Sequence, residues 1–128
     1  MPRTIALIST LLLLSTPLAA QTFRAENRVD VTGTAGGFLV ANGGGQGARG
    51  MWCAAADYSK RVLGAHGTQR IYVAQALQRG APAHFTLDPT GLTPSRVSIV
   101  SASLRTPGAS LSVYHAYVFC ADHRLNSR

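Results

Sequence analysis

Residues 52–63, WCAAADYSKRVL, decide the fold of this chain. Small and apolar side chains recur in this stretch at intervals of three and four residues, which is the spacing of one face of an α-helix. That face consists of Trp52, Ala55, Ala56, Ser59, Val62 and Leu63. Gly64 follows as a stop signal, and Asp57 and Arg61, one turn apart, are expected to pair weakly on the outer side. Because several of the face residues are small, we expect the helix to lie close against a β-sheet.

Cys53 lies inside this helix, and Cys120 is the only other cysteine of the chain. Two cysteines in an exported protein allow one intramolecular bridge, so we predict a disulfide between Cys53 and Cys120. The chain-entropy model assigns the closure of such a long loop about 4 kcal/mol. The two cysteines lack the C-x-x-C spacing of a redox pair or a zinc site. We therefore predict a structural bridge and no metal site.

Short strands surround the helix in the sequence. Apolar and charged residues alternate over 23–31, which predicts a half-buried strand with a charged outer face. Residues 38–40 follow a glycine-rich turn and are expected to form a second strand, which pairs with the first as a hairpin. Four more strands are expected. Two are centred on 71–73 and 85–87, and two cover 97–104 and 111–120.

One helix and five to six short strands predict the α+β class, with the helix packed on a mainly antiparallel sheet. Residues 111–120 are apolar on both faces, which is typical of a central strand. Cys120 falls on the face that the helix would cover, so the disulfide is expected to tie the helix to this last strand. Residues 21–128 have the length of a single small domain.

The first 20 residues have the three parts of a secretory signal. Arg3 is a basic start, residues 5–14 form an apolar core, and Leu18-Ala19-Ala20 is a small-residue exit before Gln21. A membrane anchor is the alternative, but a spanning helix needs roughly 20 apolar residues. We expect a periplasmic or secreted protein that begins at Gln21 and has no membrane span in its mature form.

The chain is basic, with 12 Lys and Arg residues against 5 Asp and Glu. Only Arg3 of these lies in the expected signal, so residues 21–128 keep a surplus of six positive charges. A basic surplus favours anionic partners, such as an anionic polymer or an envelope component. The basic residues are scattered singly along the chain, which equally fits a solvated surface with no ligand.

Residues 45–50, GQGARG, match the G-x-G-x-x-G pattern of dinucleotide-binding folds. The pattern also needs a parallel β-α-β unit and an acidic residue at the end of the next strand, whereas the strand at 71–73 is followed by Ala74 and Gln75. We therefore predict no dinucleotide and no other cofactor. The start of a helix can still attract an anion, which makes Gly47, Arg49 and Gly50 a candidate anion site.

Four histidines could act as acid, base or metal ligand. They are His66, His84, His115 and His123, and none lies in H-x-H or H-x-x-x-H spacing. The chain has no G-x-S-x-G elbow and few carboxylates for a glycosidase pair. Tyr58 and Tyr72 are the aromatic residues that we expect to expose some ring to a ligand, while Trp52 is expected to pack against the disulfide.

These observations favour a small exported binding or interaction module that is not an enzyme and slightly prefers anionic ligands. Two alternatives remain. A compact secreted phosphodiesterase, similar to a ribonuclease in its chemistry, could use two histidines and a cationic side chain. A structural envelope protein that self-associates is the other.

Overall fold

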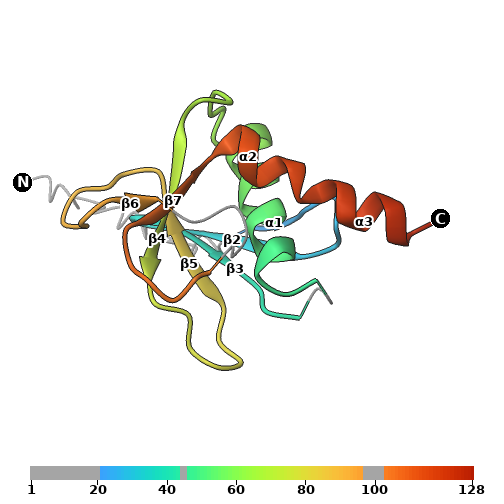
Figure 1. Cartoon of the computed structure of the whole chain (residues 1–128), viewed down its shortest axis with the longest axis horizontal. Helices are drawn as coiled ribbons and strands as arrows, with labels where there is room; N and C mark the ends of the chain where they lie inside the picture. The colour runs from blue at the N-terminus through green and yellow to red at the C-terminus, as the bar shows by residue number, and fades with distance from the viewer. Residues whose placement is uncertain (1–20, 44–45, 97–102) are drawn as a thin grey trace, which may run out of the picture.

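In the part of the chain that the structure describes, a seven-stranded sheet carries three helices packed together on one side (Figure 1). The computed structural model describes residues 21–43, 46–96 and 103–128. The strands are β1 (Thr22–Arg24), β2 (Asp30–Thr34), β3 (Gly37–Val40), β4 (Arg70–Gln75), β5 (Ala83–Thr86), β6 (Ser95–Arg96) and β7 (Ala109–Ser112). The helices are α1 (Gly47–Arg61), α2 (Val113–Val118) and α3 (Cys120–Asn126). The α+β class and the mainly antiparallel sheet are confirmed.

The strands lie in the order β1-β2-β3-β5-β4-β7-β6, and among the pairs formed by the described residues only β6–β7 is parallel. Strand β5 lies between β3 and β4 and is antiparallel to both. β3 and β4 therefore run in the same direction without touching, and α1 crosses over from one to the other. This crossover places the helix across the buried face of the sheet.

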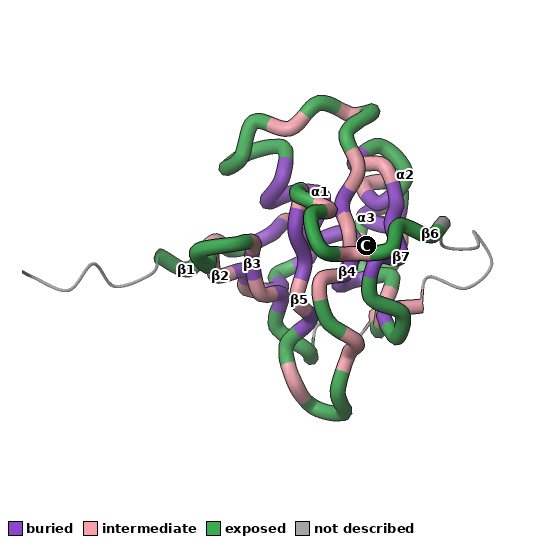
Figure 2. The backbone as a smooth tube through the Cα atoms, turned by 90° about the vertical axis from the view of Figure 1, so that its left-hand side faces the viewer, coloured by how far each residue is buried: buried purple, intermediate pink, exposed green. Residues whose placement is uncertain are grey.

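The core lies between the sheet and α1 (Figure 2). Along β3 and β5, Phe38 and Phe85 are partners in the register and their rings stack with centroids 5.8 Å apart. Trp52 on α1 packs on Phe85 at 4.9 Å between centroids, and its indole is completely buried. Alternation along each strand sends these side chains to the helix side and leaves residues such as Tyr72 on the other.

Helix α1 begins five residues earlier than the periodicity over 52–63 predicts. Its first turn contains Gly47 and Gly50, which have low helix propensity. Tertiary packing accounts for the difference, because Gly50 is buried and a Cβ there would lie 2.8 Å from the Cβ of Gln46. The Nδ2 of Asn27 also donates to the Gly50 carbonyl over 2.8 Å. The helix ends at Arg61, and Gly64 follows with a φ of +66°, as its stop position predicts.

The expected strand over 111–120 is wrong after Ser112. The chain leaves β7 there, and the Ser112 hydroxyl accepts a hydrogen bond from the N–H of His115 as the cap of α2. Val113, Ala116 and Cys120 are buried at three- and four-residue spacing, so a run that is apolar on both strand faces is equally the inner side of a helix. The bridge from Cys53 consequently reaches helix α3 and not the last strand.

The other predicted strands differ from those of the structure mainly where the chain turns. Residues 23–31 form β1, a tight turn and the start of β2, because the N–H of Ala25 bonds the Val29 carbonyl and Arg28 adopts a φ of 64°. The hairpin with the strand at 38–40 is confirmed by the β2–β3 pairing. The strand expected over 97–104 lies mostly outside the described residues, as does the signal over 1–20.

Candidate functional site

The Cys53–Cys120 disulfide is confirmed and joins α1 to the first residue of α3. Both cysteines are fully buried, and their Cα atoms lie 4.9 Å apart. None of the helices in the described residues is long and apolar enough to cross a bilayer. A disulfide without such a helix fits an extracellular or periplasmic protein.

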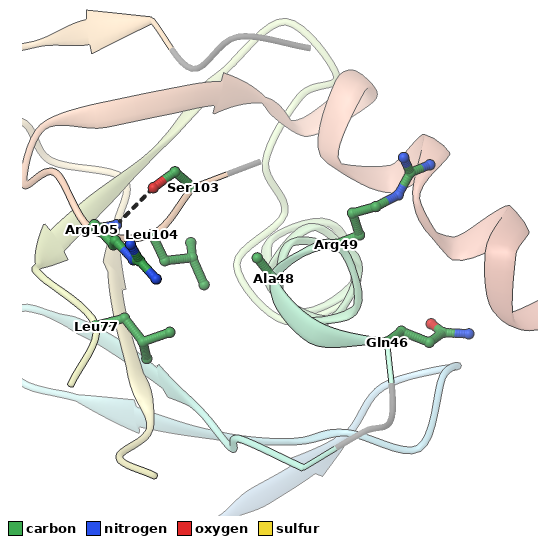
Figure 3. Close-up of a pocket in the computed structure, with 7 residues that line it drawn as sticks. All are labelled: Gln46, Ala48, Arg49, Leu77, Ser103, Leu104 and Arg105. Atoms are coloured by element: carbon green, nitrogen blue, oxygen red, sulfur yellow. Dashed lines mark hydrogen bonds between the residues drawn. The ribbon is translucent and has the colours of Figure 1, made fainter. Parts of the chain in front are cut away.

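A cavity of about 540 Å³ lies beside the first turn of α1 (Figure 3). It is lined by Gln46, Ala48, Arg49, Leu77, Ser103, Leu104 and Arg105. A second cavity of about 500 Å³ shares Leu77 and Arg105 with it and is completed by Asn42, Gln78, Arg79 and Gly80. We call these two joined cavities the arginine groove. Four segments form it: Asn42 after β3, the start of α1, the loop between β4 and β5, and residues 103–105.

Arg49 does not contribute its charge to the groove. Its Nε and Nη2 donate to the carboxylate of Asp122 on α3 over 2.8 and 3.4 Å, and its guanidinium lies 4.6 Å from the centre of the Phe119 ring. Figure 3 shows the side chain of Arg49 directed toward this helix and away from Arg105. Arg49 therefore holds α3 against the start of α1.

Arg79 and Arg105 have no carboxylate partner in the part of the chain that the structure describes. Four of the five acids are already paired with other arginines, and the fifth, Asp88, accepts hydrogen bonds from Thr90 instead. Those Thr90 bonds lower the pKa of Asp88. The groove thus carries two exposed guanidinium groups whose charge is not neutralised by a neighbouring side chain.

The glycines of the candidate anion site have separate environments. Gly47 is exposed, with a φ of +59°, at the first position of α1. Gly50 is buried, and its N–H donates to the Gln46 carbonyl over 3.3 Å. The helix has no side-chain cap and no acidic residue in its first turn, so neither offsets the positive end of its dipole, which adjoins the groove.

The expected exposure of Tyr58 is wrong, because only 7% of its surface is exposed. Its ring packs against Phe23 and Phe38 with centroids 5.6 and 4.8 Å away, and its hydroxyl lies over Gly33, 2.8 Å from where a Cβ would stand. Tyr58 still lines a cavity of about 350 Å³ with Phe23 and Val62. Tyr72 is half-buried on the sheet face turned away from the helices.

A second charged cluster ties the turn after β1 to the C-terminal helices. Glu26 accepts hydrogen bonds from the Tyr117 hydroxyl at 2.5 Å and from Nε of Arg124 at 2.8 Å. The bond to Glu26 raises the pKa of Tyr117 and also that of Arg124. These contacts fix the turn after β1 to helices α2 and α3.

Asp57 belongs to the same region and is only 2% exposed, so its expected place on the outer side of the helix is wrong. The predicted pair with Arg61 exists, with two hydrogen bonds of 2.7 and 2.6 Å, and it raises the pKa of Arg61. Asp57 also accepts the backbone N–H of Glu26 over 2.8 Å. This third hydrogen bond, from a second partner, helps to satisfy the buried carboxylate.

The histidines occupy several elements. His66 and His115 come from neighbouring segments, because the N–H of Tyr114 donates to the Gly67 carbonyl, while His84 lies on β5 and His123 on α3. None of the three cavities described above is lined by a histidine. Within residues 21–43, 46–96 and 103–128, no three His, Cys, Asp or Glu side chains are grouped so that they could hold a metal ion.

No protein-family model, curated protein or solved structure matches this chain. Function must therefore be inferred from the groove and the charges around it. Sequence reasoning missed Arg79 and Arg105 as a pair, since 26 positions and two strands separate them. The only available signal was the excess of arginine over acidic residues.

Proposed function

We propose that this chain is an exported, non-enzymatic binding module that holds anionic ligands in the arginine groove. The observation that carries the proposal is the pair Arg79 and Arg105, two guanidinium groups without a carboxylate partner among the described residues, in joined cavities of about 540 and 500 Å³. Guanidinium groups bind carboxylate, sulfate and phosphate through paired hydrogen bonds.

The remaining groove residues suit a ligand that is anionic and partly apolar. Ala48 on α1, together with Leu77 and Leu104, gives the cavity beside Arg105 an apolar lining (Figure 3). The uncapped first turn of α1 adds the favourable end of a helix dipole. An acidic polysaccharide or another polyanion can contact both arginines at once, which increases its affinity over that of a single ion.

Export supports the same function. The signal features of residues 1–20, the buried disulfide and the absence of a spanning helix in the described chain favour the periplasm or the outside of the cell. Anionic polymers of the envelope are available as ligands in both places.

The test is a titration of the chain beginning at Gln21 with heparin and with RNA at two salt concentrations. The double variant Arg79→Gln/Arg105→Gln should lose about ten-fold or more in affinity at low salt. It should also show a shallower dependence of the affinity on salt, because fewer counterions are released.

The matched control is Arg24→Gln/Arg128→Gln, which removes the same charge from exposed residues that do not line the groove. At the higher salt concentration its affinity should stay within about three-fold of the unchanged chain, since distant exposed charges are then screened. Equal losses of affinity in both double variants would show that binding depends on general surface charge and not on the groove, and would overturn the proposal. Cleavage of the RNA during the titration would instead support the histidine-based phosphodiesterase.

A further inference from the structure

Helices α2 and α3 run end to end along the outside of the molecule (Figure 1). Phe119 between them keeps near-helical torsion angles, with φ −64° and ψ −17°. Their inner side is buried against α1 and is held there by the disulfide. The opposite side is therefore the outer surface of the molecule at this place.

Three large apolar side chains lie on this outer surface. Tyr114, Val118 and Leu125 are 73%, 60% and 71% exposed. Their spacing of four and seven residues places them on one line along a helix. We call these three residues the apolar stripe. An outward helix face in a water-soluble protein normally carries polar side chains, so the stripe is the side of α2 and α3 suited to a partner.

Cationic groups flank the stripe. The Nζ of Lys60 lies 3.7 Å from the centre of the Tyr117 ring, and the Arg124 guanidinium lies 5.5 Å from the same ring. The nearby acids Glu26 and Asp122 are each paired with an arginine. Arg124 is the arginine that pairs with Glu26, so Lys60 is the flanking cation that has no carboxylate partner among the described residues.

We propose that the apolar stripe docks this protein on an anionic lipid surface. An amphipathic helix lies in the plane of such a surface with its apolar residues in the interface, its basic residues beside the headgroups, and tyrosine at the boundary. The stripe has this arrangement, with Lys60 as the unpaired basic residue beside it and Tyr114 at its first position. The positive surplus of the whole chain adds long-range attraction to anionic lipid.

A second copy of the chain fits the stripe less well. Three exposed side chains offer an area on the order of 300 Å², whereas a stable dimer buries about 800 Å² on each partner. Two copies would also bring like net charges together. Both the area and the charge therefore favour a lipid surface over self-association.

The experiment is co-sedimentation of the chain beginning at Gln21 with lipid vesicles. The sheet, the helices and the disulfide all follow that residue, and the apolar segment 5–14 is thereby removed as a competing anchor. Vesicles of phosphatidylcholine alone are compared with vesicles in which phosphatidylglycerol replaces part of it. We expect binding to the second kind only, and loss of that binding at high salt.

The double variant Val118→Gln/Leu125→Gln should lower the partition coefficient on phosphatidylglycerol vesicles about ten-fold or more. Val62→Gln/Leu63→Gln is the matched control, because these residues are also about half exposed but lie after the end of α1. The control should bind within about two-fold of the unchanged chain. Equal binding by the stripe variant and the unchanged chain would overturn the proposal, as would a lack of binding to either kind of vesicle.

The groove variant Arg79→Gln/Arg105→Gln separates this inference from the proposed function. It should retain most of its vesicle binding, because the stripe and the groove share no residue. If the groove variant loses vesicle binding and the stripe variant does not, the lipid headgroup binds in the groove and the stripe is excluded. Light scattering tests self-association. If the mass of the unchanged chain falls on dilution, and the stripe variant has half that mass, the stripe binds a second copy and lipid docking is overturned.

Discussion

The hydroxyl group of Tyr117 donates a 2.5 Å hydrogen bond to Glu26, which lies 91 residues earlier in the sequence. This bond raises the pKa of Tyr117, so the folded state holds its phenolic proton more tightly than the unfolded state does. The resulting stability is fully present below the unfolded pKa of about 10 and is lost as the pH rises through the folded pKa. Tyr117→Phe should therefore flatten part of the decrease in unfolding free energy above about pH 10.

Urea titrations from neutral to alkaline pH measure this effect. Tyr114→Phe is the control, because the Tyr114 side chain is mostly exposed. A parallel alkaline decrease in the Tyr117 variant and the unchanged chain would show that the Glu26 contact contributes no pH dependence.

The Asp57–Arg61 pair should respond asymmetrically to substitution. Arg61→Gln leaves a buried carboxylate without its cationic partner and should cost about 2 kcal/mol of unfolding free energy. Asp57→Asn should cost less, about 1 kcal/mol, because the released guanidinium reaches water and the amide oxygen can still accept the Glu26 N–H. Urea denaturation of both variants and of the double variant gives the coupling energy. A larger loss in Asp57→Asn than in Arg61→Gln would contradict this account.

Neighbouring glycines should differ sharply when alanine replaces them. A Cβ on Gly37 would lie 2.1 Å from the backbone oxygen of Phe85, whereas a Cβ on Gly36 meets nothing within 4 Å. Gly37→Ala must separate β3 from β5 and should cost about 3 kcal/mol or prevent folding. Gly36→Ala should change stability by about 0.5 kcal/mol or less. Thermal melts of the two variants measure the difference, and similar melting temperatures would contradict the close approach of β3 and β5.

The disulfide should resist reductant until the protein unfolds. Both sulfur-bearing residues are fully buried, so dithiothreitol reaches them only through opening of α3 or of the whole fold. Free-thiol assays should show slow reduction in buffer and fast reduction in urea. The double variant Cys53→Ala/Cys120→Ala should lose about 4 kcal/mol of unfolding free energy, because its unfolded chain is no longer constrained. Fast reduction under native conditions would contradict the burial.

The central part of the fold could be predicted from local patterns. Helix α1 has a clear 3.6-residue period, and β3, β4 and β5 are short apolar runs between glycine and proline residues, so their existence followed from the sequence. The bridge followed from the count of two cysteines. In each of these cases the deciding interactions are close in sequence or have only one possible partner.

The segment after Ser112 shows where local patterns fail. A short apolar run fits a buried strand and a buried helix equally well, and the cap formed by Ser112 decides between them. Asp57 presents the same difficulty, since its burial depends on the backbone of Glu26, 31 residues away. The arginine groove depends on loops that meet only in the folded chain, and no spacing in the sequence reveals such a meeting.

The bridge between α1 and α3 also determines how assembly can go wrong. Cys53 is synthesised 67 positions before Cys120, and the chain has no other cysteine. Mispairing within one molecule is therefore impossible, and during that interval an oxidised Cys53 can be joined only to another molecule. The characteristic error of this protein would be a covalent dimer, whose yield rises with the concentration of newly made chains.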